Sequence, residues 1–228
     1  MTNRKDMSNT GTGPQRAVAG VIYAVALVLV LLPVYEWVAN AMPFYSDPYD
    51  LATGLFNLPG RVFVLVGFVL MFYQFVLGIR IPALERVFTR ATNLRRHQTL
   101  GKIGFLLILL HGLFMLAYDR ALVGRFLFDP YRVIGMVALV LLIVAVMAAW
   151  HYRALKLPRK VWKPVHMLAY VVFPLGFLHA RTLGTELATS WVVNVLFSTL
   201  FVLYCVLVVY RIYIAVAGGA GRRAGQPR

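Results

Sequence analysis

Residues 95–118 read RRHQTLGKIGFLLILLHGLFMLAY, and this stretch decides the fold. Behind a pair of arginines it forms an apolar run, and about 18–20 such residues cross a bilayer as a helix. It also carries two histidines, His97 and His111. An ionisable side chain inside a membrane span is costly, and its presence indicates a function. The segment is therefore both a predicted membrane helix and a candidate site.

Five further apolar runs resemble this one in length, so the chain is predicted to cross a membrane six times. Its 228 residues are 61% apolar and 14% charged, whereas soluble domains are about 45–50% apolar and about 25% charged. The runs do not alternate apolar and polar residues, which argues against a β-barrel. The six runs cover residues 17–39, 62–79, 100–117, 133–150, 162–180 and 191–210.

Lysine and arginine are distributed unevenly between the two predicted sides. One side carries 18 of them and the other five. Because cytoplasmic loops collect Lys and Arg, both termini are predicted to be cytoplasmic. This topology accounts for most of the formal charge of +15, so nucleic acid is not an expected partner. The prediction is an all-α, multi-pass protein of the inner cell membrane, with a six-helix body over residues 17–216 and polar tails at 1–16 and 217–228.

Four of the five histidines lie in or at the ends of the third and fifth runs. His97 and His111 are 14 residues apart, and His166 and His179 are 13 apart; these spans measure roughly 21 and 20 Å along a helix. The two runs cross in the same direction, which puts His97 and His166 at the cytoplasmic level and the other two at the outer level. Two facing imidazoles per level are what bis-histidine ligation of haem iron requires. The pattern predicts two stacked haem sites.

Two other interpretations of the histidines are a zinc or copper site and a proton relay. Zinc or copper needs three or four ligands in one cluster, and histidines about 20 Å apart along a helix cannot share an ion. A lone cysteine, Cys205, excludes a Cys-ligated cluster. A proton relay in a transporter or channel is an alternative of another class. One difficulty stays open: on an ideal helix the 13-residue spacing leaves the second ring about 140° from the first, and a kink at Pro174 or a wide turn would correct part of it.

A haem group also needs space, an apolar wall and partners for its propionates. Gly104 lies midway between the histidines of the third run, and Phe173 lies between those of the fifth. We expect Gly104 to thin its helix and Phe173 to lie between the haem edges. The basic candidates for the propionates are Arg95, Arg96 and Lys102 on the inner side, and Arg132 and Arg181 on the outer side.

Residues 95–118, together with WKPVHMLAYVVFPLGFLHA at 162–180, resemble the ferric reductase-like transmembrane domain superfamily. It includes ferric reductases, the membrane part of NADPH oxidases, and the haem-binding membrane subunit of a bacterial periplasmic methionine sulfoxide reductase system. The resemblance extends over residues 17–210. It implies two b-type haems that pass electrons across the membrane, the inner one bound by His97 and His166 and the outer one by His111 and His179.

The expected function is that of a membrane cytochrome b, an oxidoreductase-type electron-transport subunit between a cytoplasmic donor and an outer acceptor. Ferric reductases and NADPH oxidases carry a cytoplasmic flavin and nicotinamide domain after the last helix, whereas 12 residues follow Val216 here. The expected donor is therefore a separate flavoprotein reductase or a quinol, with FMN or quinone supplied by the partner. A haem subunit that feeds a periplasmic oxidoreductase is the alternative. Whether the chain is an enzyme by itself stays open.

Overall fold

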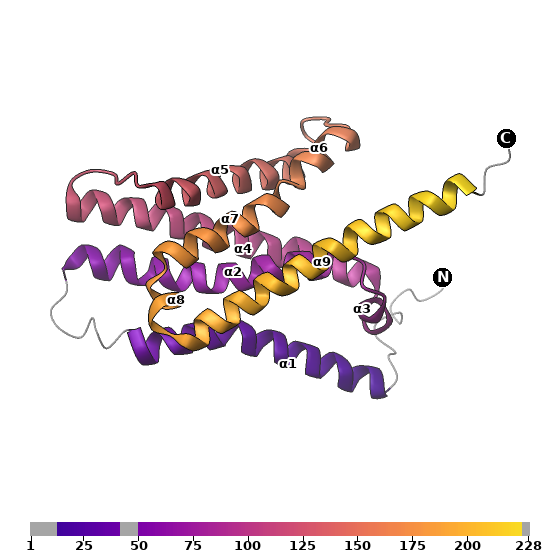
Figure 1. Cartoon of the computed structure of the whole chain (residues 1–228), viewed down its shortest axis with the longest axis horizontal. Helices are drawn as coiled ribbons and strands as arrows, with labels where there is room; N and C mark the ends of the chain where they lie inside the picture. The colour runs from indigo at the N-terminus through magenta and orange to yellow at the C-terminus, as the bar shows by residue number, and fades with distance from the viewer. Residues whose placement is uncertain (1–12, 42–49, 225–228) are drawn as a thin grey trace, which may run out of the picture.

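The computed structural model describes residues 13–41 and 50–224, which are mostly helical and contain no β-strand. Six of its helical segments are long and apolar enough to cross a membrane, which confirms the predicted all-α membrane fold (Figure 1). In chain order the elements are α1 (Gly13–Glu36), η1 (Trp37–Ala41), η3 (Thr53–Asn57), α2 (Leu58–Gly78), α3 (Pro82–Val87), α4 (Arg90–Val123), α5 (Pro130–His151), α6 (Arg159–His166), α7 (Ala169–Leu183), α8 (Thr185–Thr189) and α9 (Trp191–Ala224).

The ends of α4 and α5 follow from local chemistry. Thr89 caps α4, its side chain accepting from the Thr92 backbone N–H, and Gly124 ends that helix with a φ of 75°, which glycine adopts without strain. Asp129 caps α5 by accepting from the backbone N–H groups of Tyr131 and Arg132, each at 3.0 Å. The capped α4 is longer than the apolar run, because its polar first turns continue the same helix.

Helix α2 lies at the centre of the bundle. It packs most closely against α4, while α5 packs on α7, and α9 crosses the bundle and continues beyond it (Figure 1). Phe68 of α2 stacks on Phe173 of α7 and on Phe197 of α9, with ring centroids 4.7 and 4.3 Å apart. These rings are at most 5% exposed. Burial of such rings and their offset stacking stabilise the contact between the three helices.

The two tails expected at residues 1–16 and 217–228 lie partly outside the described residues. Where the chain is described, α1 already begins at Gly13 and α9 continues to Ala224, so helix enters both expected tails. A helix propagates readily from an established end. The cytoplasmic orientation of both ends remains a prediction.

Candidate cofactor site

His97 of α4 and His166 at the end of α6 form the inner histidine pair. Their ring centroids are 6.2 Å apart, and the ring planes are nearly perpendicular at 89°. A metal ion bound about 2 Å from each imidazole nitrogen would hold two rings about 6 Å apart. The predicted inner partners are therefore brought together at a separation that could hold one metal ion between them.

His111 of α4 and His179 of α7 form the outer histidine pair, and they lie within electrostatic range of each other. The helices that carry these residues pack on other neighbours, α4 on α2 and α7 on α5. Within the described residues, α4 and α7 have little backbone contact with each other. The outer histidines thus come from helices that belong to two different helix pairs.

Three of the four rings are held by backbone carbonyls. Nδ1 of His111 lies 2.9 Å from the Gly60 carbonyl oxygen, and Nδ1 of His179 lies 2.9 Å from that of Tyr131. Nδ1 of His166 lies 3.2 Å from the Ala145 oxygen. A carbonyl only accepts, so in each case Nδ1–H must donate, and the Nε2 lone pair is left for a metal.

The fourth ring, His97, has a buried Nδ1 without a partner of hydrogen-bond geometry. The backbone carbonyl of Gln74 nevertheless faces this ring. Gln74 and Gly60 are 14 residues apart on α2, which is the spacing of His97 and His111 on the adjacent α4. Tyr131 and Ala145 repeat the same spacing on α5. The carbonyls of α2 therefore have the same spacing as the histidines of α4, and those of α5 are one residue further apart than His166 and His179.

The angular difficulty of the 13-residue pair is reduced by a break between α6 and α7. Around Met167 and Leu168 the backbone makes hydrogen bonds over three residues, as from the Leu168 N–H to the Val165 carbonyl at 3.0 Å. Such tight turns advance about 120° per residue in place of about 100°. His166 and His179 consequently both face α5. Pro174, where the kink was expected, lies inside α7, which remains helical around it.

The other predicted cofactor residues are placed differently from one another. Gly104 is buried, and a Cβ at this position would lie 3.2 Å from the Cβ of Leu70 on α2. The absence of a side chain at Gly104 therefore lets α2 pack closely against α4. Phe173 lies in the aromatic core and is fully buried. Arg96 donates to the Tyr23 hydroxyl and stacks 4.1 Å from the Phe88 ring centroid. The side chains of Arg95, Lys102 and Arg181 are exposed.

Arg132, the other outer basic candidate, lies near the outer pair and is bound by two carboxylates. It forms ion pairs with Asp129 at 2.8 Å and with Asp119 at 3.6 Å. It directly follows Tyr131, whose carbonyl faces His179. Arg132 is thus the predicted basic residue that the structure connects to the outer pair.

Sequence reasoning missed the residues that support the outer pair. Gly135 of α5 lies so close to His179 that a Cβ there would fall 2.6 Å from Nδ1. Arg61 of α2 forms an ion pair with Glu186 of α8, and both charges act on His111. The sequence shows only that Arg61 directly precedes one apolar run and that Gly135 lies in the first turn of another. Both features are common in membrane helices.

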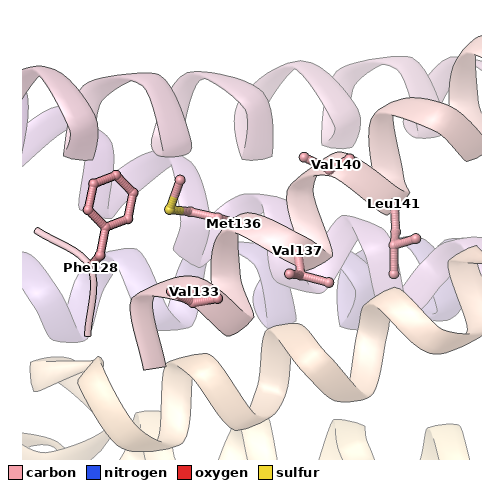
Figure 2. Close-up of a pocket in the computed structure, with 6 residues that line it drawn as sticks. All are labelled: Phe128, Val133, Met136, Val137, Val140 and Leu141. Atoms are coloured by element: carbon pink, nitrogen blue, oxygen red, sulfur yellow. The ribbon is translucent and has the colours of Figure 1, made fainter. Parts of the chain in front are cut away.

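Among residues 13–41 and 50–224, no group of three or more His, Cys, Asp or Glu side chains is arranged to hold a metal ion. The histidines described above occur in pairs. A separate hollow of about 370 Å³ lies along α5 and is lined by apolar side chains (Figure 2). These are Phe128, Val133, Met136, Val137, Val140 and Leu141. No histidine lines it.

The family model of the ferric reductase-like transmembrane component matches residues 63–177. The chain belongs to this family. The match runs from α2 into α7 and includes His97, His111 and His166, while His179 lies two residues beyond it. No curated protein matches the chain. The family confirms the predicted resemblance and makes this multi-pass membrane protein a component of membrane electron transfer, in a family whose transmembrane domains generally bind haem.

Proposed function

We propose that the chain is a haem-binding subunit that conducts electrons across the membrane, from a donor on the cytoplasmic side to an acceptor on the outer side. One observation carries the proposal. The rings of His97 and His166 lie 6.2 Å apart, His111 and His179 lie within electrostatic range of each other, and a backbone carbonyl orients three of the four rings so that Nε2 is free. Histidines that serve only packing need no such shared orientation.

His97 and His166 would hold an inner haem b, and His111 and His179 an outer one. Haem, when bound, supplies a one-electron carrier whose iron alternates between the ferric and ferrous states. The protein holds the imidazoles in one tautomer through the Nδ1 hydrogen bonds. Its core, which includes the buried Phe68, Phe72 and Phe75 of α2, holds the helices together apart from the histidines.

The side on which the electron donor binds is inferred from the distribution of basic side chains. The N-terminal part of α4 and the short α6 carry exposed basic side chains, namely Arg95, Lys102, Arg159, Lys160 and Lys163. A basic face attracts an acidic protein and speeds its encounter at low salt. A separate flavoprotein reductase with an acidic docking face is therefore the proposed donor, with a quinol as the lipid-soluble alternative. The acceptor decides between a ferric reductase-like role and a subunit that feeds a periplasmic oxidoreductase.

The test is the haem content of the purified chain. A b-type difference spectrum with two haems per chain is expected, and replacing any of the four paired histidines by alanine should lower that content. His151→Ala is the matched control, since this fifth histidine is exposed and its Nδ1 lies 3.3 Å from a carbonyl of its own helix. A folded chain without haem would refute the proposal and favour the proton-relay alternative.

A further inference from the structure

The carbonyls that face the two outer histidines share a feature that the inner ones lack. Gly60 is followed by Arg61, and Tyr131 is followed by Arg132. At the inner pair, the corresponding Gln74 and Ala145 are followed by Phe75 and Val146. An arginine thus accompanies each carbonyl at the outer level, and an apolar residue accompanies each at the inner level.

Arg61 is bound on several sides. Its guanidinium pairs with the Glu186 carboxylate and donates to the Thr185 hydroxyl, both on α8. Its Nε donates to the Asn57 side chain at 2.6 Å, one turn earlier in the chain. The side chains of Arg61 and Glu186 are only 18% and 9% exposed. This partly buried pair therefore fixes the start of α2 to α8, the short helix between α7 and α9.

Arg132 does the same at the start of α5. It pairs with Asp129, the residue that caps this helix, and with Asp119 near the end of α4. Asp119 is 7% exposed, so the pair connects α5 to a buried group of the helix that carries His111. Both arginines thus fasten the beginning of one helix to another element.

Position along the chain separates the outer carbonyls from the inner ones. Tyr131 lies in the first turn of α5, which begins at Pro130, and Gly60 lies just after the junction of η3 with α2. The first backbone N–H groups of a helix have no partner within it, so the start of α5 is held by side chains. At the η3–α2 junction the backbone hydrogen-bond pattern changes, and Arg61 supplies side-chain contacts there. The inner carbonyls, those of Gln74 and Ala145, lie nearer the other ends of the same helices.

We propose that Arg61 and Arg132 are positioning residues of the outer histidine pair: each immobilises a helical turn whose carbonyl orients one ligand, Arg61 through Gly60 for His111 and Arg132 through Tyr131 for His179. Loss of either anchor lets the carbonyl move and changes the ring angle at the outer centre. The inner centre is unaffected. This inference rests on the proposed haem function.

The test separates the effect of the positive charge of Arg61 from the effect of the planar shape of its guanidinium group. Arg61→Lys keeps the positive charge but loses the planar fork that reaches Glu186, Thr185 and Asn57 together, and Arg61→Gln loses both. Low-spin electron paramagnetic resonance reports the orientation of axial imidazoles, and the outer signal is the one that His111→Ala removes. Arg125→Gln is the matched control, because Arg125 is an exposed arginine of the α4–α5 turn.

We expect both Arg61 variants, and Arg132→Lys, to shift or broaden the outer signal while the inner signal stays unchanged, and Arg125→Gln to change neither. In the same samples, hydrogen exchange at the start of α2 should rise in both Arg61 variants. An outer signal in Arg61→Lys identical to that of the unsubstituted protein would overturn the proposal, since charge alone would then suffice. If the Arg61 variants do not fold, Glu186→Gln replaces them under the same criteria. Absence of haem from the unsubstituted protein would instead refute the proposed function.

Discussion

Gly135 of α5 and His179 of α7 are in such close contact that a Cβ at position 135 would fall 2.6 Å from Nδ1 and 2.7 Å from Cε1 of the imidazole. Real Cβ atoms do not approach a ring so closely. Only glycine at this position lets His179 reach the Tyr131 carbonyl one turn earlier. The outer histidine therefore depends on a residue without a side chain on the neighbouring helix.

Gly135→Ala should displace His179 and remove the outer haem, with a destabilisation of about 1–3 kcal/mol from overpacking. The measurement is haem content together with thermal unfolding in detergent. Gly176→Ala is the matched control on α7, because a Cβ there would meet nothing within 4 Å. Equal haem content in the two variants would contradict the predicted role of Gly135.

The four ligand histidines should separate into two groups. His111→Ala and His179→Ala should each lose the outer haem and keep the inner one, and His97→Ala and His166→Ala should do the reverse. The measurement is the redox titration of each variant, in which one of two steps disappears. If His97→Ala and His179→Ala lost the same haem, the assignment of the histidines to an inner and an outer level would be wrong. Folding should change less than haem content, since the aromatic core lies elsewhere.

Arg95 and Arg96 should behave differently although they are adjacent. Arg95 is exposed, so Arg95→Gln should slow reduction by an acidic protein donor and weaken its salt dependence. Arg96 stacks on Phe88 and donates to Tyr23 of α1, and Arg96→Gln should instead lower stability by about 0.5–2 kcal/mol. The measurements are stopped-flow reduction against ionic strength and thermal unfolding. If a quinol reduces the protein and neither variant changes the rate of that reduction, the basic loops serve membrane topology alone.

NADH or NADPH should not reduce the 228-residue chain by itself. A nicotinamide site needs a βαβ unit with a glycine-rich turn, and the described residues contain no strand. Reduction should begin when a flavin reductase or a quinol is added. Reduction by NADPH in a preparation free of other flavoproteins by mass spectrometry would overturn the split between donor and membrane subunit.

The cap of α5 should make stability depend on acidity. Hydrogen bonds from the backbone N–H and then the side chain of Arg132 hold the pKa of Asp129 below its ordinary value of 3.8. A lowered pKa in the folded state gives stability that is complete above the ordinary value and is lost as the pH falls through the lower one. Asn also caps helices but does not titrate. The melting temperature of the protein should therefore fall relative to Asp129→Asn below that pH, and a constant difference would contradict the prediction.

The sequence determined the number of membrane helices and the heights of the histidines, because both depend on quantities that are local in the chain. Hydrophobic length sets the span, and the rise per residue sets the level. The pairing of His97 with His166 at 6.2 Å was accessible for the same reason. Even the 13-residue mismatch was visible, although its correction by tight turns at Met167 and Leu168 was not, since a kink at Pro174 or a wide turn was expected instead.

Tertiary structure decided how each ring is held and what each neighbouring side chain does. Gly104 and Phe173 lie between the histidines in sequence, yet they pack against α2, because the face a helix presents depends on its partner. Arg96 donates a hydrogen bond to the hydroxyl of Tyr23, which is 73 residues earlier in the chain. Arg61 forms an ion pair with Glu186, 125 residues later in the chain, only because α8 packs against the start of α2. Hydrogen bonds to backbone carbonyls and partly buried ion pairs join segments far apart in the chain, and the packing of the helices alone brings them together.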